Sequence, residues 1–329
     1  MASGSSLDAE LRTALAAADQ LLVGDAEVLA DPESAGQLYR DAVARGSGAA
    51  ASRLAMMAAV GVGRPPDWNE ALDRLLEGAL LGDRNARRQL AVLAQASEAR
   101  IISGEAESSA VWQRLRSGLN TEALLVPAPV EWVSNQPKIG FIREFASPAV
   151  CRWLIRRSGD LLAPGQVNDA QTGLPRAHTM RTAMSAAFTV LNRDVVVALM
   201  QARAERATGL RVAQHEPPNV IKYEPGQEFS EHFDFIDPLS PHFRNELELL
   251  GQRVVTCVTY LNDGFKGAET AFPAAGLKLR GGVGDCILFV NVQPDGQPDR
   301  QTLHAGLPPV AGRKWILSQW LRNRPQPLL

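Results

Sequence analysis

Small and apolar residues recur regularly along the first 118 residues and predict helices. This part is rich in Ala, Leu, Arg and Glu and poor in β-branched residues, a composition that favours helix. The pattern repeats every 36 residues, so we expect two copies of a helix, a glycine-containing turn and a second helix. Residues 1–118 are therefore predicted to form an α-helical repeat domain. The matching positions are Ala35 and Ala71, Gly46 and Gly82, Leu54 and Leu90, and Ala55 and Ala91.

The pattern changes after residues 119–137, which carry three prolines and little periodicity. We expect a linker or an extended entry strand there. Beyond it, short runs of β character alternate with clusters of Gly, Pro, Asn and Asp, and helical segments remain at about 147–162 and 192–207. Residues 138–329 are therefore predicted to form a barrel or a sandwich of two sheets. The clearest strand runs are Asn219–Tyr223, Val254–Leu261, Asp285–Val290 and Lys314–Leu321.

Composition and charge exclude several classes of protein. Of the 329 residues, 45% are hydrophobic and 21% charged, and the net charge is −2, so no basic field draws the chain to nucleic acid. No apolar run approaches the roughly 18 residues that cross a bilayer, and we expect no membrane partner. The three cysteines are odd in number and far apart, which argues against a disulfide framework. A cytoplasmic location fits these features.

The candidate chemistry begins with His232 and Asp234. Side chains two residues apart point to the same side of a strand, so both would face one cavity. On a helix the same spacing would separate them by about 200°. Together with His304, they offer two imidazoles and one carboxylate, a set that can occupy one face of an iron(II) ion and leave three positions open.

Lys314 opens a second candidate feature, an apolar run in which Lys314, Ile316, Ser318 and Trp320 share one strand face. If that face lines the interior, the ammonium group needs an anion, because an unpaired buried charge is costly. The alternative is that Lys314 extends to water at a strand end. Trp320 either packs in the core or contacts a substrate.

These residues lie within a longer ordered set of motifs. The segments are Tyr223–Asp234, Gly251–Arg253, Thr256–Asp263, Gly267–Pro273, Gly284–Phe289, His304–Gly306 and Gly312–Trp315. Their order resembles the prolyl 4-hydroxylase family of iron(II)- and 2-oxoglutarate-dependent dioxygenases, over about residues 138–325. Arg181-Thr182 resembles the Arg-Thr-Ser element of that family, although Ala183 replaces the serine. Val290 and Ala268 also depart from the usual pattern, which cautions against assuming the usual substrate.

The resemblance implies a double-stranded β-helix (jelly-roll) with flanking helices, and hence an α+β multidomain protein. It implies iron(II) and 2-oxoglutarate as cofactor and cosubstrate, with ascorbate as a further candidate. It also implies roles for individual residues: iron ligands His232, Asp234 and His304; a partner of the distal 2-oxoglutarate carboxylate, Lys314; cosubstrate contacts Tyr223 and Tyr260; and substrate contacts Arg181 and Trp320.

The helical part resembles tetratricopeptide-related repeats of the Sel-one type. That resemblance implies contact with a protein, such as recruitment of a protein or peptide substrate. The alternative is a plain helical bundle with a chance repeat, because stacked repeats need neighbours to bury their faces.

Three functions remain open from the sequence. The first is hydroxylation of a prolyl residue in a protein or peptide, with succinate and CO₂ as coproducts. The second is hydroxylation of a free amino acid or small metabolite, and the third is a catalytically idle repeat scaffold. A zinc hydrolase uses a similar ligand set, but the chain has no His-Glu-x-x-His helix, and hydrolysis gives Lys314 no role.

Overall fold

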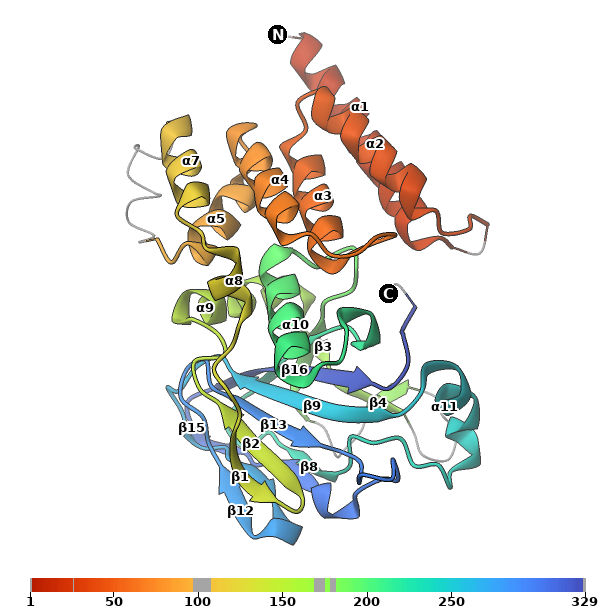
Figure 1. The fold of residues 1–329 in the computed structure, drawn as a ribbon, viewed down its shortest axis with the longest axis vertical. Helices are drawn as coiled ribbons and strands as arrows, with labels where there is room; N and C mark the ends of the chain where they lie inside the picture. Colours follow the sequence, from red (N-terminus) through yellow and green to blue (C-terminus); the bar gives the residue numbers. More distant parts are fainter. Residues whose placement is uncertain (1, 26, 97–107, 169–174, 178–181, 328–329) are drawn as a thin grey trace. The chain divides into compact units, whose positions relative to one another are not determined.

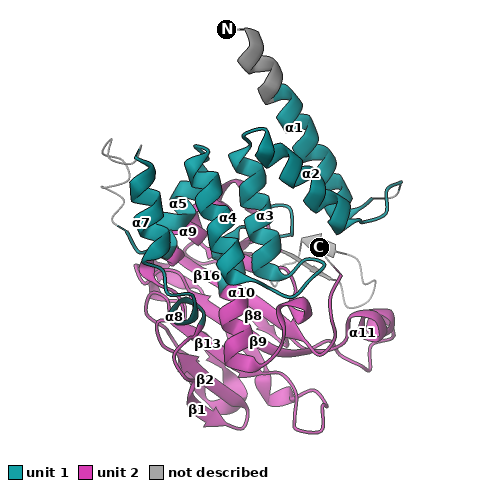
Figure 2. Ribbon diagram, turned by 45° about the horizontal axis from the view of Figure 1, so that its top comes forward, with its two compact units in different colours: residues 1–125, 189–199, 328–329 teal, residues 126–188, 200–327 magenta. Residues whose placement is uncertain are grey.

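A computed structural model describes residues 2–25, 27–96, 108–168, 175–177 and 182–327 (Figure 1). The chain divides into two compact units (Figure 2). Unit 1 comprises residues 1–125, 189–199 and 328–329, and unit 2 comprises residues 126–188 and 200–327. Unit 1 is helical and unit 2 is rich in strands. The predicted α+β class is therefore confirmed, whereas the predicted domain boundaries stay predictions.

Unit 1 contains two helix pairs with the same spacing. Helix α4 begins and ends 36 residues after α2, and their N-cap residues Asp31 and Asp67 each accept a hydrogen bond from a backbone amide three residues on. Gly46 and Gly82 close the first helix of each pair with φ of 95° and 90°, a region that favours glycine. The repeat type stays a prediction. The helices are α1 (Ala2–Val23), α2 (Pro32–Ala44), α3 (Gly48–Val60), α4 (Trp68–Leu80), α5 (Arg84–Leu93), α7 (Ser109–Ser117) and α8 (Thr121–Leu125).

Two glycines let helices α3 and α4 approach each other closely. A Cβ added to Gly48 would lie 2.9 Å from the carbonyl oxygen of Gly78, and a Cβ on Gly78 would lie 2.9 Å from that of Gly48. Both distances are too short for a carbon–oxygen contact. Only glycine at these positions therefore allows the two backbones to touch.

Unit 2 is built on two main antiparallel sheets. The larger has the strand order β1-β2-β13-β9-β16-β7-β6-β3, and the smaller has the order β12-β11-β14-β8. Two ribbons, β10-β15 and β4-β5, complete the described strands. The larger sheet consists of β1 (Glu131–Asn135), β2 (Lys138–Ile142), β3 (Ala163–Pro164), β6 (Met184–Ala187), β7 (Asn219–Tyr223), β9 (Arg253–Tyr260), β13 (Cys286–Val290) and β16 (Lys314–Arg322).

The smaller sheet and the remaining elements are short. The smaller sheet consists of β8 (Phe229–His232), β11 (Thr270–Phe272), β12 (Leu277–Leu279) and β14 (His304–Gly306). The ribbons are β4 (Gln166–Asn168) with β5 (Pro175–Ala177), and β10 (Lys266–Gly267) with β15 (Pro309–Ala311). The helices are α9 (Pro148–Ser158), α10 (Val195–Thr208), which begins in unit 1, and α11 (Arg244–Leu250).

The core of unit 2 lies between the two main sheets, as in a jelly roll. Ile221, Val258 and Ile287 of the larger sheet belong to one buried cluster with Phe229 and Phe272 of the smaller sheet. The four predicted strand runs are all strands, with ends within one residue of the predicted ones. Residues 119–137 were predicted to be a linker or an extended entry strand, and a strand, β1, is present there. Among the described residues, no helix has the length and apolar character to cross a membrane.

Candidate metal centre

Strands β8 and β14 and the bend after β8 bring His232, Asp234 and His304 together. The strands are antiparallel neighbours, and His304 lies directly opposite His232. One ligand atom from each of the three residues lies within 4.8 Å of the others. Each histidine Nε2 is 3.6 Å from a carboxylate oxygen of Asp234. The three side chains therefore converge on one point.

The prediction that His232 and Asp234 lie on one strand is wrong. Strand β8 ends at His232, and Asp234 lies in a bend beyond it. Asp234 leaves the hydrogen-bonded ladder of the smaller sheet and bonds to Thr256 of the larger one. Contact between the sheets, as well as alternation along a strand, thus positions the carboxylate.

Backbone carbonyls fix the orientation of both imidazoles. Nδ1 of His232 is 2.8 Å from the carbonyl oxygen of Ser230, and Nδ1 of His304 is 3.0 Å from that of Thr302. A carbonyl only accepts, so each Nδ1 carries a proton and donates it. The Nε2 atoms then carry the lone pairs that bind a metal. Two neutral imidazoles and one carboxylate with open positions fit iron(II).

A short hydrogen-bonded chain supports the buried carboxylate. The Asn291 side-chain amide donates to the Thr256 hydroxyl at 2.9 Å, and that hydroxyl donates to Asp234 Oδ2 at 2.8 Å. Because the Thr256 oxygen accepts the hydrogen bond from Asn291, its own proton is directed to the Asp234 carboxylate. Burial acts to raise the pKa of Asp234, but electrostatic attraction to His304, His232 and Arg253 and the hydrogen bond from Thr256 lower it below the usual value. The carboxylate is therefore held ionised.

Aromatic rings enclose the histidines. Phe229 stacks on His232 with ring centroids 3.5 Å apart and an angle of 15° between the planes. Phe289 and Phe272 pack against His304 at 4.8 and 5.6 Å. These rings limit the movement of both imidazoles and exclude water from their outer faces.

Lys314 is a buried cation at the start of β16. It is 1% exposed, and its Nζ donates to the Ala268 carbonyl oxygen at 2.8 Å. The rings of Tyr223 and Tyr260 lie 5.3 and 5.0 Å from Nζ. Burial lowers the pKa of Lys314 to about 7. Within the described part of the chain, no carboxylate lies within 4.0 Å of this ammonium group. It therefore fits an external anion such as the distal carboxylate of 2-oxoglutarate.

The predicted face of β16 lines one cavity together with the three converging side chains. Lys314, Ile316, Ser318 and Trp320 all border it, as does Tyr223. This part of the sequence prediction is confirmed. The indole N–H of Trp320 is buried and has no hydrogen-bond partner among the described residues, while Arg253 lies over its ring at 4.2 Å.

Two other predicted contact residues, Tyr260 and Arg181, are not among the described residues that border this cavity. The Tyr260 hydroxyl donates to the Leu279 carbonyl oxygen at 3.1 Å and accepts from the Thr270 hydroxyl at 2.9 Å. Its one proton is therefore already donated, and its role towards 2-oxoglutarate stays a prediction. Arg181 lies outside the described residues.

The sequence did not predict the supporting roles of Thr256, Asn291 and Phe229. Thr256 alternates with Val258 and Tyr260 along β9, and this spacing marks the inward face of that strand. A polar residue on an inward face was thus the available signal for Thr256. No comparable signal marks Asn291, which follows the apolar run of β13.

Comparisons with known proteins agree with this chemistry. Residues 218–322 match the family model of the 2OG-Fe(II) oxygenase superfamily. The chain is 30% identical over 213 residues to the probable prolyl 4-hydroxylase 10 of Arabidopsis thaliana, covering 59% of this chain and 71% of that protein. It is also 30% identical over 207 residues to the prolyl 4-hydroxylase subunit alpha-1 of Rattus norvegicus, covering 63% of this chain and 38% of that one.

Two solved structures of prolyl hydroxylases align with part of this chain. The 2OG complex of the viral collagen prolyl hydroxylase from Paramecium Bursaria Chlorella virus-1 aligns with a TM-score of 0.42 at 26% identity, over 56% of this chain and 95% of that chain. A Pseudomonas putida prolyl-4-hydroxylase aligns with a TM-score of 0.38 at 19% identity, over 56% and 92% of the two chains.

Proposed function

Because this chain belongs to the 2OG-Fe(II) oxygenase superfamily as a prolyl 4-hydroxylase-like dioxygenase, we propose that it hydroxylates a prolyl residue in a protein or peptide. Succinate and CO₂ are the coproducts of that reaction. The observation that carries the proposal is one cavity bordered by His232, Asp234, His304 and Lys314. A zinc hydrolase gives the buried ammonium group no function.

Each side chain has a role in this proposal. His232, Asp234 and His304 hold iron(II), and Lys314 and Tyr223 hold the distal end of 2-oxoglutarate. When bound, iron(II) and 2-oxoglutarate together supply the activation of dioxygen that hydroxylates a C–H bond. Thr256 keeps the Asp234 carboxylate in one orientation, and the phenylalanines keep water away from the imidazoles. The protein thus contributes geometry and a dry cavity.

Trp320 and Arg181 are the proposed substrate contacts. The indole N–H of Trp320 is buried at the cavity without a described partner. A backbone carbonyl of a peptide would satisfy this donor, and burying it unsatisfied is costly. The similarity of this chain to prolyl 4-hydroxylases supports a prolyl substrate.

Ascorbate as a further cofactor and a cytoplasmic location belong to the same proposal. All three cysteines are free and buried, which fits a reducing compartment. Succinate yield with and without ascorbate tests the first point, and fractionation of cells that express the tagged full chain tests the second.

The direct test is turnover of the full chain with iron(II), 2-oxoglutarate and a proline-containing peptide. We expect succinate and a peptide heavier by one oxygen atom, measured by mass spectrometry. Asp234→Ala and His232→Ala should abolish both signals, because each removes an iron ligand. Unchanged turnover in both variants would refute the metal site.

Other outcomes separate the alternatives. Oxygen incorporation into free proline but not into any peptide would favour a small-molecule hydroxylase. Iron binding without succinate formation on any substrate tested would favour the idle scaffold.

A further inference from the structure

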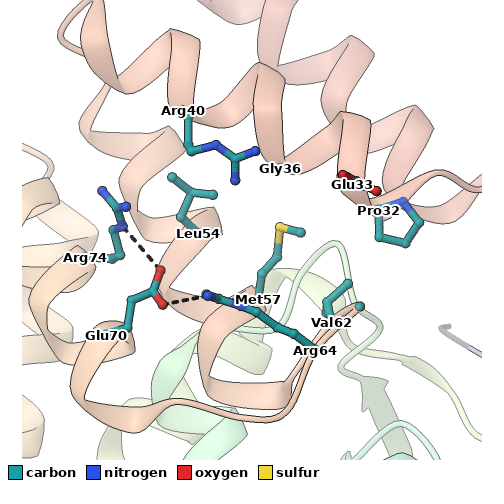
Figure 3. A pocket seen from close by; sticks show the side chains of 11 residues that line it. Pro32, Glu33, Gly36, Arg40, Leu54, Met57, Val62, Arg64, Glu70 and Arg74 are labelled. Atoms are coloured by element: carbon teal, nitrogen blue, oxygen red, sulfur yellow. Dashed lines mark ion pairs between the residues drawn. The ribbon is translucent and has the colours of Figure 1, made fainter.

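Unit 1 contains a pocket of about 410 Å³ that the proposed reaction does not use (Figure 3). Helices α2, α3 and α4 and the loop after α3 contribute its walls. We call it the helical pocket and define it by Gly36, Arg40, Leu54, Met57, Arg64 and Arg74. Its size is within the range of pockets that bind small ligands or a few residues of a peptide.

The charges of the helical pocket are unevenly paired. Glu70 forms ion pairs with Arg64 and with Arg74, whose side-chain nitrogens lie 2.8 and 3.7 Å from its carboxylate oxygens (Figure 3). Arg40 instead donates to the neutral side-chain oxygen of Gln37, at 3.1 and 2.8 Å. Among the described residues, no carboxylate lies within ion-pair distance of Arg40. Its guanidinium extends over the open space above Leu54 and Met57 (Figure 3).

The other acid at the pocket does not cancel this charge. Glu33 lies in the first turn of α2, where a negative charge is favourable at a helix N-terminus. Three arginines and two glutamates line the pocket, and Arg74 also pairs with Glu77 at 2.8 Å. Arg40 is therefore the lining arginine that has no carboxylate partner among the described residues. An anionic group near Arg40 would therefore be attracted.

Comparison of the two helix pairs shows that the space depends on one glycine. Gly36 occupies the position that Leu72 occupies 36 residues later, and Leu72 is completely buried. A Cβ on Gly36 would lie 3.4 Å from Arg40 Nη1 and 3.6 Å from Met57 Cε. Glycine inside a helix is less stable than alanine. The first helix pair thus leaves open, at a cost to the helix, a space that the second pair fills.

From these features we propose that the helical pocket binds a peptide segment that carries a carboxylate beside an aliphatic side chain. The carboxylate pairs with Arg40, whose guanidinium suits planar carboxylates. The aliphatic side chain packs on Leu54 and on Met57, a residue type that adapts to different partners. This binding needs neither iron nor 2-oxoglutarate, so it stands or falls separately from the proposed hydroxylation.

The test is fluorescence anisotropy with the full chain and three labelled peptides. The first is Gly-Leu-Glu-Leu-Gly with an amidated C-terminus, and the second replaces its Glu with Gln. The third is Gly-Leu-Gln-Leu with a free C-terminus, which separates a terminal carboxylate from a side-chain carboxylate. We expect at least one carboxylate peptide to bind about tenfold more tightly than the Gln peptide, from the loss of a charge-assisted hydrogen bond.

Two variants and one control locate the binding. Arg40→Gln removes the cation from an exposed helix position and should remove the preference for the carboxylate. Gly36→Leu places in the pocket the residue that the second pair carries, and should weaken binding of all three peptides. Arg88→Gln, at an exposed arginine of α5 outside the pocket, should bind like the parent chain.

Three results would overturn the proposal. The first is equal affinity of the parent chain for the carboxylate and Gln peptides. The second is unchanged carboxylate preference in Arg40→Gln when circular dichroism shows the variant folded. Unchanged peptide affinity in a folded Gly36→Leu variant would show that binding occurs elsewhere, and would equally overturn it.

Discussion

Asp234 keeps its charge in a buried position partly because the Thr256 hydroxyl points at it. Thr256→Val removes this hydroxyl without changing the shape of the side chain. Losing such a partner of a metal ligand typically weakens metal affinity by about 10–100-fold. We expect a loss of this size when manganese(II) or cobalt(II) is titrated into the metal-free full chain.

The chain provides a matched control for this change on the same strand. Thr259 is also fully buried in β9, but its hydroxyl has no partner among the described residues. Thr259→Val should leave metal affinity unchanged, and Thr256→Ser should retain it. Equal metal affinity of Thr256→Val and Thr259→Val would show that the hydrogen bond to Asp234 is unimportant.

Lys314 gives the cosubstrate a predicted pH dependence. Its pKa is about 7 before an anion binds, and a bound carboxylate stabilises the charged form and raises that value. Binding therefore takes up a proton above pH 7, and affinity for 2-oxoglutarate should fall by up to about tenfold per pH unit there. Isothermal titration from about pH 6 to pH 9 with manganese(II) bound measures this slope.

Substitutions at Lys314 separate charge from shape. Arginine stays charged throughout this range, so Lys314→Arg should bind more weakly but with a flat pH profile. Lys314→Met should lose 2-oxoglutarate binding while raising the melting temperature of the ligand-free protein, because a buried charge is removed. A flat profile in the parent chain would contradict the role of Lys314.

Residue positions were predictable where the alternation along a strand determined them. Lys314 and Trp320 were placed correctly on one face because alternation along a strand is independent of the rest of the fold. The support that Thr256 and Asn291 give to Asp234 was not predictable. It depends on Asp234 leaving its own sheet and on which strands of the other sheet lie opposite it.

At the scale of elements, the sequence predicted four strands together with their ends, but not where the short strand β8 ends. The β-branched runs of β7, β9, β13 and β16 are long and bounded by turn residues, which makes them easy to detect. Strand β8 has only four residues, and Phe229–His232 carries no β-branched residue. Its end therefore follows from pairing with β14, which the local sequence does not show.

Two glycines of the helical unit should respond oppositely to alanine. Gly78→Ala places a Cβ 2.9 Å from the Gly48 carbonyl oxygen and 3.1 Å from Ala86 Cβ, and should destabilise the unit by about 1–3 kcal/mol. Gly36→Ala meets only ordinary contacts and should stabilise it by up to about 1 kcal/mol through helix propensity. Urea unfolding followed by circular dichroism measures both. Stabilisation by Gly78→Ala would show that α3 and α4 do not touch through these glycines.

At the scale of the whole molecule, the chain returns to the helical unit after entering the sheet. Residues 189–199 belong to unit 1. Val190 joins the buried cluster that contains Leu22 and Tyr39, and the Val195 amide donates to the Gln89 side-chain oxygen at 2.9 Å. The sequence could not show this return, because an apolar helix of this length fits a single oxygenase domain equally well.

This return predicts the outcome of a truncation. A chain that begins at residue 126 would keep residues 189–199 but lose the helices against which Val190 packs. We expect this shortened protein to bind a hydrophobic dye and to aggregate, in contrast to the full chain. Replacing Val190 with Ser in the shortened protein should improve its solubility. A shortened protein as soluble and as heat-resistant as the full chain would contradict the division into units.

Strand β16 pairs with β7 on one side and with β9 on the other, and it supplies alternate residues to the cavity. Deleting a single amino acid at its start would exchange its two faces, placing Trp315 where Lys314 now stands. The ammonium group and the Trp320 indole would then be lost together. New substrate preferences are therefore more accessible through replacement of Ile316 or Ser318 than through any change in strand length.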